Sequence, residues 1–187
     1  MLDCRAREID VVAMRLMLLR HAKTEKAAAD MHDRDRALNP RGHKDGSRIG
    51  AYIAHHALIP DAVIVSPARR TQETWALVAG ALSTSPPMRT DDRLYKNTAA
   101  DIIAIIEEGF GPRRCLLLVG HNPSFHDVAR LLIGTGDVGA RERLHEAMPT
   151  GALAVIDFPG GNPRGHLLKS GRLERFVTPR SLREATD

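Results

Sequence analysis

Cysteine is nearly absent from the sequence. Cys4 and Cys115 are the only two in 187 residues, too few for a disulfide framework and more typical of a reducing compartment. No apolar run is long enough to cross a bilayer. The apolar stretch at residues 11–19 is a poor signal peptide, because Arg15 interrupts it. We therefore expect a cytoplasmic protein with no membrane partner.

Aromatic residues are also scarce, at 4% of the chain. The net charge is +4 and the isoelectric point is about 9.4, but the basic residues are scattered rather than grouped. A nucleic-acid-binding surface usually combines a basic stripe with stacking aromatics. We expect no nucleic-acid partner, and we interpret the charge as a mild attraction for anionic substrates.

Metal-binding spacings are missing, although the chain has nine histidines. Neither H-E-x-x-H nor H-x-H occurs, and the neighbouring His55 and His56 cannot share one ion on a helix. The other histidines away from strand ends are expected at the surface or in caps: His32, His43, His126, His145 and His166. The sequence predicts no metal and no cofactor.

The composition that remains is that of an ordinary globular domain, with 43% hydrophobic and 27% charged residues. We expect one domain over residues 14–178, a disordered extension at 1–13 and a polar tail at 179–187. Met14 is then a candidate for the functional start of the chain. The oligomeric state is not predicted.

Strand patterns alternate with helix patterns along this domain. Short β-branched or apolar runs predict strands, and apolar residues at helical spacing follow cap-and-proline pairs. This alternation predicts an α/β fold, a three-layer α/β/α sandwich around a mostly parallel central sheet. Strands are expected at 16–19, 62–65, 115–119 and 152–158, with one short strand later. Helices are expected to start at Asn39-Pro40, Ser66-Pro67, Thr98 and Asn122-Pro123, the first of them closing at Pro60.

Polar groups follow three of these strands. The first ends at Arg20 and His21, the second is followed by a Ser-Pro pair and two arginines at 66–70, and the third by His121. In an open α/β sheet, ligands bind at the carboxyl ends of the strands. Arginine forks and helix N-termini suit phosphate, and a neutral imidazole can attack phosphorus. The three segments together predict a phosphate site with a histidine nucleophile.

These segments lie within stretches that resemble the histidine phosphatase superfamily, whose fold is phosphoglycerate-mutase-like. The resemblance is greatest to the small SixA-type phosphohistidine phosphatases and runs from about Met14 to Phe158. The stretches are LMLLRHAKTE (16–25), DRALNPRG (35–42), VSPARRTQET (65–74), DRLYKNTA (92–99) and LLLVGHNPS (116–124).

The resemblance implies roles for four residues. His21 would be the nucleophile that forms a phosphohistidine intermediate, while Arg20, Arg70 and His121 would hold the phosphoryl oxygens. Arg69 would face outward. A protonated His121 beside a neutral His21 would give the pair separate titrations. Residues expected to line the substrate site are Thr24, Asn122 and Ser66.

One position departs from the resemblance. Many relatives carry a glutamate after an Arg-Leu-x pattern as general acid, whereas this chain has Lys96. An alkoxide leaves poorly without a proton, so the change favours phosphohistidine in a protein as substrate. The short segments between the motifs leave no room for a capping domain, which suits a protein substrate. Asp33, Asp92 and Tyr95 are possible substitutes for the acid.

Other functions stay open. The protein could be a phosphomonoesterase for a small metabolite, or a non-catalytic module that binds phosphate or a phosphoprotein. Residues 134–139 match G-x-G-x-x-G, and Asp157 follows about twenty residues on, which imitates a dinucleotide-binding fingerprint. The stretch before it has helical rather than strand periodicity, so we do not favour that function.

Overall fold

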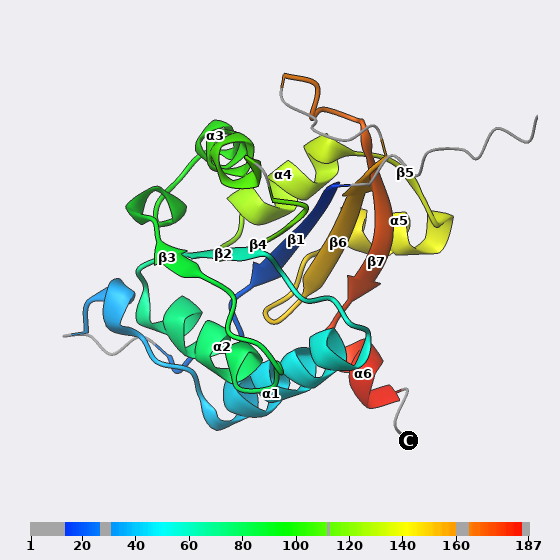
Figure 1. Ribbon diagram of the computed structural model, residues 1–187. Coiled ribbons are helices and arrows are strands. Elements are labelled where there is room, and N and C mark those ends of the chain that lie inside the picture. The colour runs from blue at the N-terminus through cyan, green and yellow to red at the C-terminus, as the bar shows by residue number, and fades with distance from the viewer. Residues whose placement is uncertain (1–13, 27–30, 112, 160–164, 185–187) are drawn as a thin grey trace, which may run out of the picture.

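The fold is seen in a computed structural model that describes residues 14–26, 31–111, 113–159 and 165–184. The predictions for residues 1–13, with Cys4, and for 185–187 lie outside these ranges. The described strands form one 7-stranded sheet in the order β3-β2-β4-β1-β6-β7-β5 (Figure 1). Their bounds are β1 Met14–Arg20, β2 Ala62–Val65, β3 Met88–Thr90, β4 Cys115–Gly120, β5 Ile133–Gly136, β6 Leu153–Phe158 and β7 Gly171–Val177.

The central strands β2, β4 and β1 run parallel to one another, and β3 also runs parallel beside β2. Their continuous apolar runs are explained by burial on both faces, since residues 16–19 and 116–119 are fully buried. Strand β6 pairs antiparallel with β1 and with β7. The predicted α/β fold with a mostly parallel sheet is confirmed.

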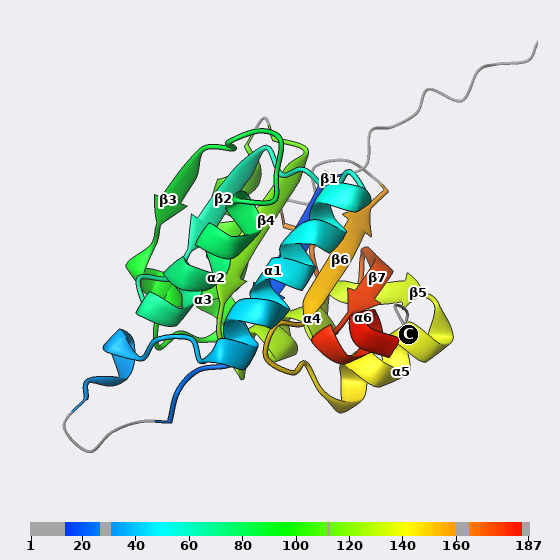
Figure 2. The same cartoon turned by 90° about the horizontal axis from the view of Figure 1, so that it is seen from below.

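Helices cover both faces of the sheet (Figure 2). One apolar core lies between the sheet and α1, α2 and α6, and a second lies against α3, α4 and α5. Their bounds are α1 Pro40–His55, α2 Arg69–Ala79, α3 Ala99–Phe110, α4 Ser124–Leu132, α5 Val138–Glu146 and α6 Pro179–Glu184. Short 3-10 turns occupy η1 Asp33–Asp35 and η2 Asp92–Leu94. Among the described residues, no helix is both long and apolar enough to span a membrane.

Two of the four predicted helix starts are confirmed by their caps. The Asn39 side chain accepts from Gly42 N at the start of α1, and Thr98 forms a capping box with Asp101 at the start of α3. Helix α1 ends at His55, before the Pro60 that was expected to close it.

The other two predicted starts are wrong. Helix α2 begins at Arg69 and α4 begins at Ser124, and neither helix has a side-chain hydrogen bond at its N-cap. The side chains of Ser66 and Asn122, expected as caps, make tertiary hydrogen bonds instead. Ser66 comes directly after β2 and Asn122 lies two residues after β4, so their side chains bond residues near the strand ends rather than the first turn of a helix.

The carboxyl-terminal part is more ordered than the sequence pattern indicated. Residues 179–184, expected as polar tail, form α6, and β5 and β3 had no predicted counterpart. Helix α6 contacts α1, where Arg183 donates to the buried carboxylate of Asp45 at 3.1 Å. This long-range ion pair fixes the last helix to the domain, which no local pattern could predict.

Candidate functional site

The three predicted strand ends meet at one edge of the sheet. Strands β1 and β4 are in register up to Arg20 and Gly120, and His21 N donates to Gly120 O at 3.0 Å. Ser66 N donates to Val119 O at 3.0 Å, which aligns the end of β2 with the same edge. Parallel register therefore brings the segments together, because equivalent ends of parallel strands share one edge.

His21 is held in one tautomer by the backbone. Its side chain is almost fully buried, and Nδ1 lies 2.8 Å from Ala22 O. A carbonyl oxygen can only accept, so Nδ1 carries the proton and Nε2 keeps its lone pair. The arrangement leaves Nε2 as a nucleophile or as a hydrogen-bond acceptor.

His121 lies beside it, with ring centroids 5.2 Å apart and planes tilted by 56°. Arg70 Nε donates to His121 Nδ1 at 3.3 Å, so Nδ1 is unprotonated and Nε2 donates to Ser66 Oγ at 2.8 Å. The two histidines, Arg70 and Ser66 thus form one contiguous cluster.

Both imidazoles are neutral at neutral pH. Burial lowers the pKa of His21 to about 4, helped by the charges of Arg70 and Arg20. Burial also lowers the pKa of His121 to about 3, together with the neighbouring His21 and Arg70. A neutral His21 agrees with the expectation from the sequence, whereas the low pKa of His121 leaves that imidazole neutral too, in contrast to the protonated His121 that was expected.

These pKa values predict that acid destabilises the protein. An unfolded histidine titrates near about 6.5, so below that pH the unfolded chain takes up protons that the folded His21 and His121 do not. The free energy of unfolding should fall by about 1–2 kcal/mol per histidine between pH 7 and pH 5. Urea denaturation at both pH values measures this. This loss of unfolding free energy should be smaller in a variant with His21→Gln and His121→Gln. It should be unchanged in a control in which the exposed His43 and His55 are replaced by Gln. An equal loss in the first variant and the parent protein would show that His21 and His121 are not the buried neutral histidines.

Arg70 is tied to a carboxylate from the long loop after β1. Its two Nη atoms donate to Asp33 O at 2.6 Å and Asp33 Oδ2 at 3.0 Å, and the hydroxyl of Tyr95 donates to the same Oδ2 at 3.1 Å. Burial alone would raise the pKa of Asp33, but the hydrogen bonds from Arg36 and Tyr95 and the charge of Arg70 lower it to about 2. Asp33 is therefore ionised and orients Arg70. The neighbouring Arg69 is exposed and pairs with Glu73 instead.

Arg20 approaches the cluster from the end of β1. Its Nη1 donates to Met148 O at 2.8 Å, and Asn122 Nδ2 donates to the same oxygen at 2.9 Å. Arg20 Nε is buried without a hydrogen-bond partner, and the guanidinium has no acidic partner within the described ranges. Burial lowers its pKa, as expected for a cation without a counter-ion. Such a group suits an anionic ligand.

Arg36 is a site residue that the sequence reasoning missed. It lies 15 positions after His21, yet its charge contributes to the lowered pKa of His21. Its Nη2 donates to Thr24 Oγ1 at 2.7 Å, and its Nη1 donates to Asp33 Oδ1 at 3.1 Å. Arg36 therefore joins Thr24, a predicted site residue, to the Asp33–Arg70 pair. The stretch at 35–42 was the available signal, but only folding of the loop brings Arg36 to His21.

Gly42 lets helix α1 lie close to this loop. A Cβ there would collide with the carbonyl oxygen of Lys23, which also accepts from Asn39 N at 3.0 Å. Gly42→Ala should therefore displace Lys23 and Thr24, costing about 1–3 kcal/mol of stability and lowering kcat/KM. Thermal unfolding and phosphate release measure both effects. Gly80→Ala, where a Cβ makes only ordinary contacts, is the matched control; equal behaviour of the two variants would refute this role.

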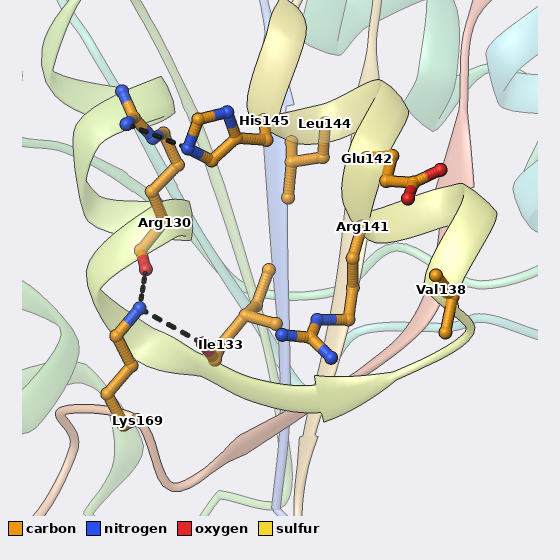
Figure 3. A pocket seen from close by; sticks show the side chains of 8 residues that line it. All are labelled: Arg130, Ile133, Val138, Arg141, Glu142, Leu144, His145 and Lys169. Carbon is orange, nitrogen blue, oxygen red and sulfur yellow. Dashed lines mark hydrogen bonds between the residues drawn. The ribbon is translucent and has the colours of Figure 1, made fainter.

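A separate hollow of about 300 Å³ lies between α4, β5 and α5, away from these strand ends (Figure 3). Arg130 bonds His145 at 3.1 Å, and Lys169 Nζ donates to Arg130 O and Ile133 O at 2.7 and 3.4 Å. Lys169 thus caps the C-terminal end of α4, and the bond between Arg130 and His145 joins α4 to α5. The glycine-rich stretch 134–139 lies here on edge strand β5 and the start of α5, after a helix, which does not fit a dinucleotide-binding turn.

Within the described ranges, no group of three or more His, Cys, Asp or Glu side chains is arranged to hold an ion.

Three residues were considered as substitutes for the missing general acid. Asp33 is ionised, and Asp92 is exposed and paired with Arg34. Tyr95 keeps its proton, because burial and Asp33 raise its pKa.

Comparison with known proteins gives the family. Residues 16–96 match the model of the histidine phosphatase superfamily (branch 1). An uncharacterized protein of Mycobacterium tuberculosis is 31% identical over 144 residues, which cover 76% of this chain and 88% of that protein. An uncharacterized protein of Mycobacterium leprae is 30% identical over 167 residues, 87% of this chain and 100% of that protein. The chain belongs to the histidine phosphatase superfamily.

Solved structures agree with this assignment. A protein from Agrobacterium tumefaciens, provisionally named as the phosphohistidine phosphatase SixA, is 28% identical with a TM-score of 0.74; the match covers 89% of this chain and 98% of that one. A protein of the same provisional name from Nakamurella multipartitia is 26% identical with a TM-score of 0.77, covering 89% and 96%. The predicted phosphoglycerate-mutase-like fold is thereby confirmed.

Proposed function

We propose that the protein is a metal-independent phosphatase that removes phosphate from phosphohistidine in a protein, with His21 as nucleophile. The observation that carries the proposal is the tautomer of His21. The bond from Nδ1 to Ala22 O leaves the Nε2 lone pair free, and the low pKa keeps it unprotonated at neutral pH. A neutral, backbone-oriented imidazole is what attack on phosphorus requires.

The first step is an in-line displacement. The Nε2 lone pair of His21 forms a bond to phosphorus while the bond to the leaving group breaks, and the leaving atom takes that electron pair. The Ala22 carbonyl stabilises the positive charge that develops on the ring, because it already accepts from Nδ1. Water then attacks the phosphorus of phospho-His21 and releases phosphate, which restores the imidazole.

Arg20 and Arg70 provide the positive charge for the transferring phosphoryl group. Arg20 has a buried Nε without a partner, and Asp33 fixes the orientation of Arg70. An anion between Arg70 and His121 would also raise the pKa of His121, because it favours the charged imidazolium. His121 would then take up a proton on Nδ1, which breaks the bond from Arg70 Nε, and its Nε2 would donate to a phosphoryl oxygen in place of Ser66 Oγ. Positioned charges of this kind supply most of the catalysis in phosphoryl transfer.

The substrate preference rests on the missing acid. Lys96 is exposed at the position of the glutamate, and Asp33 holds no proton at neutral pH. Tyr95 keeps a proton, but its raised pKa makes it a weak acid. A P–N bond needs less help from an acid than a P–O bond does. The site therefore suits phosphohistidine better than an alkyl phosphate.

A panel of substrates tests this proposal. Purified protein in EDTA should release phosphate from a phosphohistidine peptide much faster than from a phosphoserine peptide or a sugar phosphate. The panel also includes p-nitrophenyl phosphate, a P–O substrate whose leaving group needs no acid. Faster release from the sugar phosphate would favour the metabolite phosphomonoesterase. Phosphate binding without any turnover would favour a non-catalytic module. A loss of activity in EDTA would refute metal independence.

We also propose a cytoplasmic location, because the low cysteine content is typical of a reducing compartment.

A further inference from the structure

A second hollow, with a volume of about 460 Å³, is lined by residues that follow His21 in the chain. It is formed by the segment that follows His21 and by the end of the long loop where that loop enters α1. Its lining residues are Lys23, Thr24, Glu25, Lys26, Arg36 and Asn39. Three cations and one carboxylate give this hollow, the cationic subsite, an excess of positive charge.

The subsite is connected to the phosphate-binding cluster. Arg36 lines the hollow, and its charge also lowers the pKa of His21. Asp33 bridges the two arginines, since Arg36 Nη1 and Arg70 Nη2 donate to its two carboxylate oxygens at 3.1 and 3.0 Å. The hollow and the cluster around His21 are therefore joined through one carboxylate.

The lysines of the subsite are available to a partner. Lys23 and Lys26 are exposed, and neither ammonium group has an ion pair with a described residue. Arg36 differs, because its Nη atoms are already taken by Asp33, Thr24 and the Glu25 carbonyl. Its buried Nε has no hydrogen-bond partner, but both Nη groups are bound within the loop, so the two lysines supply the positive charge that no described carboxylate pairs.

We propose that the cationic subsite binds carboxylate side chains that flank the phosphohistidine on an acidic protein partner. The inference rests on the proposed function and adds the charge of the partner surface. Flexible lysine ammonium groups around an open hollow match carboxylates spread over a protein surface better than one compact second phosphate. The hollow is also larger than one oxyanion needs.

Binding to the His21→Ala protein tests the subsite without turnover. Two phosphohistidine peptides are compared by fluorescence anisotropy, at mildly alkaline pH and low ionic strength: one with Asp and Glu around the phosphohistidine, the other with Asn and Gln in their place. We expect the acidic peptide to bind about tenfold more tightly. The ratio of the two affinities should fall to about one when Lys23→Glu and Lys26→Glu are added.

The control reverses two exposed arginines on α5, Arg141→Glu and Arg143→Glu, which lie toward the β5 edge of the sheet (Figure 1). The affinity ratio should stay high in this control, because the change in net charge is the same but the place differs. Equal affinities in the parent protein, or equal loss of the ratio in both variants, would overturn the proposal. The proposal would also be overturned if the Lys23→Glu/Lys26→Glu variant lost tight binding of inorganic pyrophosphate but bound both peptides as the parent protein does.

Turnover by the unsubstituted chain is measured on the same peptides. Phosphate release from the neutral peptide tests the proposed function alone, because that peptide does not need the cationic subsite. Turnover without a preference for acidic peptides refutes the subsite and keeps the phosphatase. A preference in binding without turnover supports the subsite and refutes the phosphatase.

Discussion

His21→Ala is expected to abolish phosphate release, lowering kcat/KM for a phosphohistidine peptide by at least about 10,000-fold. The variant loses the Nε2 lone pair that attacks phosphorus, and no other described imidazole can replace it. His121 lies with its ring centroid 5.2 Å away, but its Nδ1 accepts from Arg70 and its Nε2 donates to Ser66. Steady-state kinetics measure the loss, and acid quenching of the unsubstituted enzyme should trap an acid-labile phosphoryl group on the protein.

The matched control for this prediction is His55→Ala, which removes an exposed imidazole at the end of α1. It should leave kcat/KM within about twofold of the parent value, as expected for a surface change. Circular dichroism must show that both variants are folded. A folded His21→Ala protein that retains turnover, or a phosphoryl group trapped on another residue, would rule out His21 as the nucleophile.

Arg70→Ala should lower kcat/KM by about 100–1,000-fold, the second largest effect that the site predicts. Arg70 is a buried cation fixed by Asp33 and by His121, so its charge is oriented before substrate arrives. Removing it takes away phosphate-binding donors and leaves Asp33 as a carboxylate near the incoming phosphate. Vanadate affinity should fall along with turnover, which a purely structural role would not require.

Arg69→Ala is the control for Arg70, because it changes the same residue type one position away. The Arg69 side chain is exposed and bonds only Glu73, at 2.7 Å. The loss of such an exposed pair costs at most about 1 kcal/mol of stability, and kcat/KM should stay close to that of the parent. Equal losses from the two substitutions would show that the site was assigned to the wrong arginine.

Much of the architecture could be predicted from local patterns. The strands at 62–65 and 115–119 are buried apolar runs that can pack only inside a sheet, so their positions follow from composition. Asn39 and Thr98 mark helix starts because their side chains bond the first free backbone N–H groups. Where a polar residue follows a strand directly, as Ser66 does, the same pattern failed, because the side chain has a tertiary partner in His121.

The sequence by itself determined an α/β domain in which Arg20, His21 and His121 stand at the ends of buried strands, since apolar runs and the residues after them are local features. Only the tertiary structure decided what surrounds them. The parallel register of β1, β2 and β4 brings the strand ends together, and the loop after β1 places Asp33 and Arg36 beside Arg70 and His21. The free energy that fixes these contacts comes from burial and from ion pairs between residues distant in sequence, to which no local pattern is sensitive.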